Sequence, residues 1–178
     1  MKTLALAASI GLAALTCHAS SVEYRVFVLA GEMPTSAEII RLYENRLITP
    51  EISGSAKVRS DGTFSDDHTK AYSYPTAFTK SGVPEKTATT ELGHKFTGKV
   101  KTTNNVRVIS FTLTDIQKVM EKIYLHDSGK GMPTPVLAHL SFETEATTMP
   151  DDNSWVVLGG LVTNDEKHTF LALRIRAR

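Results

Sequence analysis

The stretch Val22–Leu29, VEYRVFVL, decides the class of fold that this chain adopts. Every second residue in it is β-branched or aromatic, whereas the positions between include Glu23 and Arg25. Because successive side chains of a strand point to opposite faces, this alternation predicts a β-strand with one buried face. The set expected on that face is Val22, Tyr24, Val26 and Val28.

A short helix is expected directly after this strand. Gly31–Pro34 interrupts the strand pattern, and Thr35 with Glu38 has the spacing of a capping box, in which each side chain satisfies a free backbone N–H. Apolar residues then recur at helical spacing until Pro50, which forces the residue before it out of the α region. The sequence therefore predicts an amphipathic helix over 35–47.

The segment from Ser53 to Lys101 is poor in large aliphatic residues and rich in Thr, Ser, Gly, Lys and Asp. Its length predicts either extended segments that pair on the sheets or a functional loop. Within it we expect a short strand at Ala56–Arg59 and a turn at Asp61–Gly62. Its aromatic residues argue against disorder; they are Tyr72, Tyr74, Phe78 and Phe96.

The rest of the chain is expected to form further antiparallel strands. Asp115–His126 is ambiguous, because its apolar residues have helical spacing, so a second short helix over 115–126 and a strand are competing interpretations. The predicted class is mainly β (α+β), with one or two short helices. The expected strands are Leu92–Lys101 with Val106–Leu113, then Val136–Glu143, and finally Trp155–Val162 with Thr169–Arg176.

The first residues have the pattern of an export signal. Lys2 precedes an apolar run from Leu4 to Leu15, and Cys17-His18-Ala19 is a small-x-small cleavage pattern. We therefore predict a secretory signal peptide over 1–19 and one mainly-β domain over 20–178. Lipidation at Cys17 is the alternative, although the residues before this cysteine do not have the spacing that a lipid-attachment signal prefers. The leader is of a bacterial type and indicates the periplasm or outer membrane of a Gram-negative-type bacterium.

Composition excludes several classes of partner. The chain has 20 Lys and Arg against 19 Asp and Glu, so it lacks the basic field that a nucleic acid backbone requires. No apolar run reaches the roughly 20 residues of a membrane-spanning helix. Because the single cysteine precedes the predicted cleavage point, the exported domain would contain no disulfide.

No pattern in the sequence predicts catalysis, a cofactor or a metal site. Asp66-Asp67-His68 is interpreted as a solvated loop, and Asp151-Asp152-Asn153 as a turn without calcium-loop spacing. GxSxG and SxxK motifs are absent. The histidines that follow neither an HxH nor an HExxH pattern are His94, His126, His139 and His168. The protein is therefore expected not to be an enzyme.

Several short motifs, in order, resemble the C-terminal core of the secretins, the outer-membrane ring proteins of type II and type III secretion. Tyr74–Phe78 (YPTAF), followed by Gly93–Phe96 (GHKF), is similar to their YPT…G-x-x-L stretch, and Trp155–Leu161 (WVVLGGL) is similar to their V-x-x-G-G-L ending. Gly98–Lys101 departs from the family by lacking the proline of its V-x-P motif. The residues that carry the resemblance are Tyr74, Pro75, Gly93, Trp155, Gly159, Gly160 and Leu161.

The resemblance implies a non-catalytic subunit or accessory of an outer-membrane secretion or transport assembly. Its partners would be copies of itself or other envelope components, with an outer-membrane contact among the expectations. Gly159-Gly160 would mark a bulge or a close backbone approach, and Trp155 a core or interface anchor. The alternative function is a self-contained periplasmic β-sandwich that binds a ligand or an envelope protein, with Ser53–Thr90 as its recognition loop.

Overall fold

The computed structural model describes residues 19–103, 106–125, 131–148, 153–162 and 167–177. The predicted signal peptide therefore lies outside the described residues, apart from Ala19. The elements in chain order are β1 (Ala19–Ala30), α1 (Ser36–Glu44), β2 (Ile52–Lys57), β3 (Thr63–Asp67), β4 (Lys70–Phe78), β5 (Pro84–Thr103), β6 (Val106–Leu125), β7 (Gly131–Thr148), β8 (Val156–Val162) and β9 (Lys167–Ala177).

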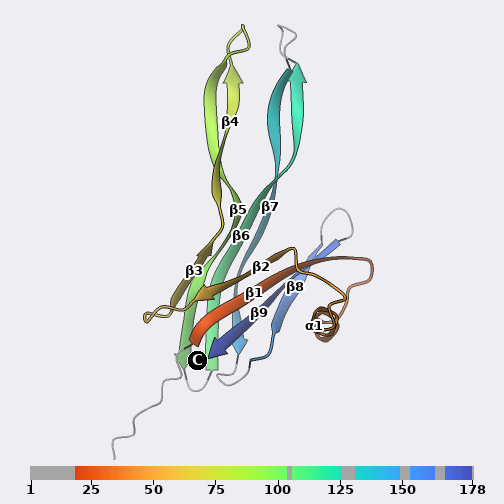
Figure 1. Ribbon diagram of the computed structural model, residues 1–178, viewed down its shortest axis with the longest axis vertical. Helices are drawn as coiled ribbons and strands as arrows, with labels where there is room; N and C mark the ends of the chain where they lie inside the picture. Colours follow the sequence, from red (N-terminus) through yellow and green to blue (C-terminus); the bar gives the residue numbers. More distant parts are fainter. Residues whose placement is uncertain (1–18, 104–105, 126–130, 149–152, 163–166, 178) are drawn as a thin grey trace, which may run out of the picture.

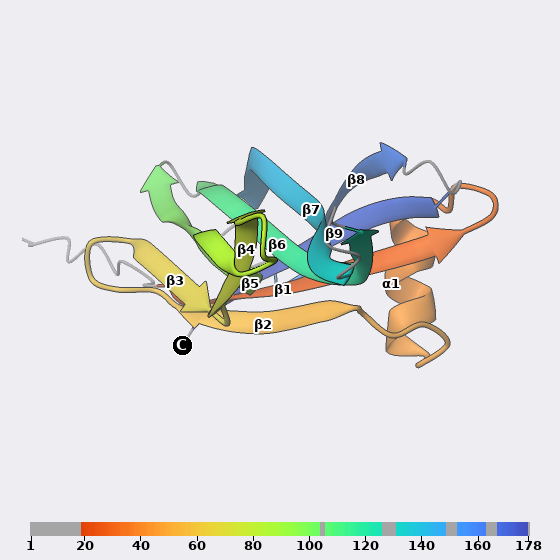
Figure 2. The same ribbon diagram turned by 90° about the horizontal axis from the view of Figure 1, so that it is seen from above.

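Two antiparallel sheets form the body of the molecule, which confirms the mainly-β class. The first sheet has the strand order β2-β1-β9-β8, and the second has the order β3-β5-β6-β7 with β4 also paired to β5. The strands of the first sheet run obliquely across those of the second (Figure 1), and the view from above shows the two layers face to face (Figure 2). Both expected hairpins, around 102–105 and at the chain end, are present.

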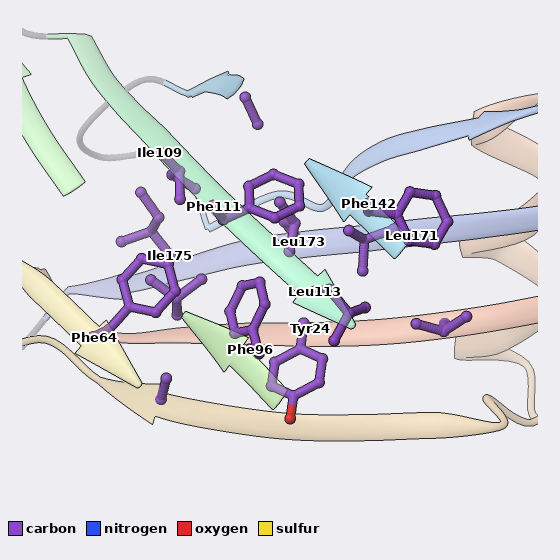
Figure 3. Packing of buried hydrophobic residues seen from close by; sticks show 14 of the residues in the cluster. Tyr24, Phe64, Phe96, Ile109, Phe111, Leu113, Phe142, Leu171, Leu173 and Ile175 are labelled. Carbon is purple, nitrogen blue, oxygen red and sulfur yellow. The ribbon is translucent and has the colours of Figure 1, made fainter. Parts of the chain in front are cut away.

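The core between the sheets is aromatic at its centre (Figure 3). Phe96 is fully buried, and its ring lies 4.3 Å from that of Tyr24 and 5.0 Å from that of Phe64, between centroids. Val22 and Val26 join Tyr24 in the core as the alternation predicted, whereas Val28 is only partly buried. Alternation also places the aliphatic residues of β6 and β9 correctly, namely Ile109, Leu113, Leu171, Leu173 and Ile175.

The helix α1 covers part of the outer face of the first sheet. Thr35 accepts a hydrogen bond from the backbone N–H of Glu38, whose carboxylate accepts one from the Thr35 backbone N–H at 2.9 Å, so the predicted capping box is confirmed. Ile39 packs against Phe170 and Ala172 beneath it. Phe170 and Ala172 belong to the face of β9 that points away from the core between the sheets, so the helix covers this end of that face.

Of the two competing interpretations of 115–126, the strand is correct and the second short helix is wrong. β6 continues as one strand to Leu125, which pairs with Gly131 of β7. The apolar residues at helical spacing in this stretch have no core to face, and Val119, Met120 and Ile123 are exposed. Pairing with β7 satisfies the backbone of this stretch as well as a helix would, so the tertiary partner decided the conformation.

The polar segment from Ser53 to Thr90 is not a loop. It forms most of β2 together with β3, β4 and the first part of β5, so the expectation of paired extended segments is the correct one. The short strand expected at Ala56–Arg59 begins earlier, at Ile52, and ends at Lys57. The predicted turn at Asp61–Gly62 is present; Gly62 has φ +82°, and a Cβ there would lie 2.4 Å from the Val100 carbonyl oxygen.

Two hairpins extend beyond the sandwich as separate arms (Figure 1). We define arm 1 as 70–92, in which β4 pairs with the first half of β5, and arm 2 as 117–125 with 131–138, in which the second half of β6 pairs with the first half of β7. At a strand rise of about 3.3 Å per residue, each arm is about 30 Å long. Among the described residues, no helix is long and apolar enough to cross a membrane.

Candidate functional site

The arms expose backbone edges along their whole length. Gly93–Thr103 of β5 pairs with Val106–Ile116 of β6. The residues of β5 before Gly93 and those of β6 after Ile116 do not pair with each other, so the two strands separate there. Each arm is thus a two-stranded ribbon in which the outer strand, β4 in arm 1 or β7 in arm 2, has one partner, and within the described part of the chain no third strand pairs with its other edge. Such ribbons are marginally stable in water by themselves, and their free N–H and C=O groups can pair with another strand.

Exposed large apolar side chains concentrate on the arms. Met120 is 53% exposed and Ile123 is 69% exposed, and their register with β7 places them on opposite faces of arm 2. The arms touch at their bases, where the Lys118 ammonium lies 5.2 Å from the centre of the Tyr72 ring and Tyr72 stacks on Tyr74. The arms therefore combine open edges with uncovered apolar surface.

The residues that carry the secretin resemblance do not form one site. Tyr74 and Pro75 lie in β4 on arm 1, whereas Gly93 lies in β5 at the base of that arm. Trp155 directly precedes β8, an edge strand of the first sheet, and the rest of the motif lies within β8. That remainder comprises Gly159, Gly160 and Leu161. The structure therefore distributes the motif over an arm, the arm base and a sheet edge.

The glycine pair in β8 has both of the features expected of it. Gly159 pairs with Phe170 and Leu161 with Thr169, so the register shifts across Gly160 as in a bulge. A Cβ on Gly159 would lie only 2.1 Å from Cδ1 of the Phe170 ring. Phe170 is nearly fully buried under α1 and has little room to move.

Gly159→Ala should therefore lower the free energy of unfolding by about 1–3 kcal/mol, because the Phe170 ring must shift within a packed core. Urea denaturation of the variant and the original protein measures this difference. The same substitution in a Phe170→Leu background should cost less, because the smaller side chain leaves room. Equal costs in both backgrounds would show that the close approach is not what requires glycine.

Trp155 is held between cationic and aromatic side chains. The Arg174 guanidinium lies 4.4 Å and that of Arg25 lies 5.5 Å from the indole centre, and the Tyr43 ring meets it edge-on at 5.9 Å. The Arg25 Nε atom donates a hydrogen bond to the Tyr43 hydroxyl at 3.1 Å. Trp155 is thus an anchor between β8, β9 and α1, in agreement with its predicted role.

A groove of about 620 Å³ runs beside this anchor between α1 and β8. Arg174, in its wall, donates to Glu23 at 2.6 Å, and Arg176 also pairs with that carboxylate. Burial opposes ionisation of Glu23, but these arginines outweigh it and hold its pKa below the ordinary value. The groove is lined by Ser36, Ala37, Ile40, Arg41, Glu44, Asn153, Ser154, Trp155, Val157 and Arg174.

A cluster of titratable side chains lies at the base of arm 1. The Tyr24 hydroxyl donates to Oδ2 of Asp66 at 2.8 Å, and Nε2 of His68 lies 2.9 Å from Oδ1 of the same carboxylate. The His68 ring packs on the His94 ring with 4.8 Å between centroids. Burial and the bond to Asp66 raise the pKa of Tyr24 far above its ordinary value, so this phenol stays protonated.

The neighbouring Asp67 fixes the turn between β3 and β4. Its carboxylate accepts hydrogen bonds from the Thr69 hydroxyl at 2.7 Å and the Thr69 backbone N–H at 3.0 Å, and it pairs with Lys95 at 3.1 Å. The bonds from Thr69, and then Lys95, lower the pKa of Asp67 to about 2. Interpreting Asp66-Asp67-His68 as a solvated loop was therefore wrong, since both carboxylates belong to β3 and have specific partners.

Sequence reasoning missed this cluster because its members come from β1, β3, β5 and the turn that follows β3. The one available signal was the i, i+2 spacing of Asp66 and His68, which puts both on one face of an extended segment. His139 is exposed on β7, and His168 lies 3.1 Å from the Gly31 carbonyl oxygen. His126 and the Asp151-Asp152 pair lie outside the described residues. In the described ranges, no three acidic, histidine or cysteine side chains are grouped to hold a metal ion.

Gly93 and the cluster together mark the point where arm 1 leaves the sandwich. Gly93 has φ +112°, and a Cβ there would lie 2.2 Å from the His68 carbonyl oxygen, so this crossing requires glycine. The backbone N–H of His68 donates to the His94 carbonyl oxygen at 2.9 Å.

Comparison of the chain with protein-family models, curated proteins and solved structures returned no match.

Proposed function

We propose that this protein is an exported, non-catalytic envelope protein that assembles with copies of itself through its two arms. The assembly would be a subunit or accessory of an outer-membrane secretion or transport system, as the resemblance to the secretin core implies. The location in the periplasm or at the outer membrane rests on the leader sequence of residues 1–19.

The observation that carries the proposal is the pair of two-stranded arms with open edges. A ribbon about 30 Å long whose outer strand pairs with no third strand among the described residues is a template for strand pairing, and soluble proteins normally block such edges. The outer edge of arm 1 belongs to β4 and that of arm 2 to β7, so one copy offers two different edges. Pairing of unlike edges is a heterologous contact, which closes into a ring when the rotation between copies allows it.

The exposed apolar side chains of the arms also favour a second copy of the protein as the partner. Val83 lies close to the tip of arm 1, and Val119, Met120 and Ile123 lie on arm 2, all more than half exposed. Burying a side chain of this size at an interface contributes about 1.5–3 kcal/mol. A second copy would supply both the strand edge and the apolar side chains that cover these residues.

The mass of the protein in solution tests the proposal. The full chain is expressed with its own leader, purified from the envelope fraction and measured by light scattering after size exclusion, with and without mild detergent. We expect a large oligomer whose mass is an integer multiple of the protomer. A monomer in both conditions would contradict the proposal.

The groove beside Trp155 favours a second candidate function, the binding of an acidic peptide or protein segment. Arg41 and Arg174 outnumber Glu44 among its lining side chains, and a groove of about 620 Å³ falls within the size range of ligand sites. Trp155 is the only tryptophan of the chain, so its fluorescence reports occupancy directly.

Titration with a tryptophan-free peptide rich in Asp and Glu should then change the Trp155 fluorescence saturably. Arg41→Glu should weaken this binding at least about tenfold, because it reverses a charge at the groove without altering the core. Arg59→Glu, far from the groove in sequence and on no groove-lining element, is the matched control. A titration without saturation would dismiss this candidate.

A further inference from the structure

The junction of arm 1 with the sandwich contains a partly buried imidazole, whose buried Nε2 atom has no hydrogen-bond partner among the described residues. His94 points into the core side of β5, next to Tyr24, with 6.1 Å between ring centroids. Its Nε2 atom is buried and has no partner among the described residues, whereas the other ring at this junction, His68, is held by Asp66. An imidazolium in this position would have a buried N–H that nothing accepts.

The surroundings of His94 oppose a positive charge on balance. Burial has the largest influence and the neighbouring His68 the next, and together they hold the pKa of His94 below its ordinary value. The groups that favour the charged form are Asp66 and Asp67 on β3 and Asp115 on β6, which lies directly across from His94 in the register. Asp115 already accepts a hydrogen bond from Gln117 at 2.6 Å.

His68 and His94 lie where arm 1 joins the sandwich, so a charge on His94 affects the attachment of the arm. β5 is paired on both sides from Lys95 to Lys99 but only with β4 on the arm side of Gly93, so arm 1 joins the sandwich at this crossing. The crossing consists of the contact between the His68 and His94 rings, the backbone hydrogen bond between these two residues and the close contact of Gly93 with His68. A positive charge on His94 would act directly on this crossing.

We propose that His94 makes the attachment of arm 1 acid-sensitive: when it takes up a proton, the His94 ring separates from the His68 ring and the base of the arm opens. The opening is a local one, since the aromatic core around Phe96 begins two residues further along β5. It is a property of a single chain and does not depend on whether the arms self-associate.

The sign of the pH dependence follows from linkage. The closed state holds His94 with a lowered pKa, and in the open state this side chain regains its ordinary value near 6.5. The open state therefore binds more protons, so closure is fully stabilised above about pH 6.5 and loses stability as the pH falls below that value. Within the titration window, each fall of one pH unit increases the population of the open state by as much as about tenfold.

Hydrogen–deuterium exchange of the full-length protein at pH 7.5 and pH 5.5 tests the proposal. After correction for intrinsic exchange rates, amides at 68–72 and 90–94 should exchange at least about threefold faster at pH 5.5. His94→Gln, which does not titrate, should abolish this acceleration. His139→Gln removes an exposed histidine of β7 and is the matched control, with the acceleration unchanged.

Two results would overturn the proposal. One is exchange at the arm base that does not respond to pH, or that responds equally in His94→Gln. The other comes from an NMR titration of the imidazole resonances, which needs no substitution. If His94 titrates at or above the ordinary histidine pKa, its burial does not oppose protonation and it cannot act in this way.

Discussion

Lysine at positions 120 and 123 should convert the assembled protein into a folded monomer. Met120→Lys and Ile123→Lys place one charge on each face of arm 2, so neither face can enter an apolar interface. Losing the burial of two such side chains costs about 3 kcal/mol or more, which corresponds to a dissociation constant raised about a hundredfold. Light scattering over a concentration series measures this change.

The matched control uses two residues that are equally exposed but lie outside the arms. Met33 is 60% exposed and Leu47 is 71% exposed, and they flank α1. The double variant Met33→Lys with Leu47→Lys should keep the original mass. Dissociation of this control as well would indicate that general surface polarity, and not the arms, governs assembly. An unchanged mass of the arm 2 variant would exclude this arm from the interface.

Phe96→Ala should cause the largest loss of stability of any single truncation in the aromatic core. Phe96 is fully buried and packs on the rings of Tyr24, Phe64 and Phe111, so its removal leaves a cavity bounded by both sheets. Truncations of this kind lower the free energy of unfolding by about 3–5 kcal/mol. Urea denaturation followed by circular dichroism gives the value.

Two further variants make this prediction specific. Phe96→Leu retains most of the apolar volume and should lose clearly less stability, which keeps the comparison measurable if the alanine variant does not fold. Leu47→Ala removes a mostly exposed side chain and should change the free energy of unfolding by less than about 0.5 kcal/mol. A loss below about 1 kcal/mol for Phe96→Ala would show that the two sheets do not share this core.

The features that local sequence patterns predict correctly are those that one element determines by itself. The alternation in β1 placed Val22, Tyr24 and Val26 in the core, and the spacing of Thr35 and Glu38 placed the start of α1. The Gly159-Gly160 pair likewise marked a real bulge with a close approach to Phe170. In each case a period or a cap is sufficient, because the physical cause lies within a few residues.

The errors lie where a distant partner decides the outcome. Residues 115–126 have helical spacing, yet they form a strand because β7 supplies hydrogen bonds along their whole length. Asp66 and His68 seemed solvated because nothing nearby in sequence reveals that Tyr24 and His94 meet them. For the polar segment 53–90 the sequence left paired strands and a loop as alternatives, because two-stranded arms bury little and so require few apolar residues.

The sequence by itself determined the mainly-β class, the strand faces in the core and the cap of α1, because side-chain alternation and capping are local physical effects. Only the tertiary structure decided that two hairpins leave the sandwich as arms, and that His94 lies unpartnered against His68 at the base of one of them. Strand partners and neighbours across a sheet are set by contacts between residues far apart in the chain. The residue pattern within one segment therefore does not reveal which distant segment it contacts.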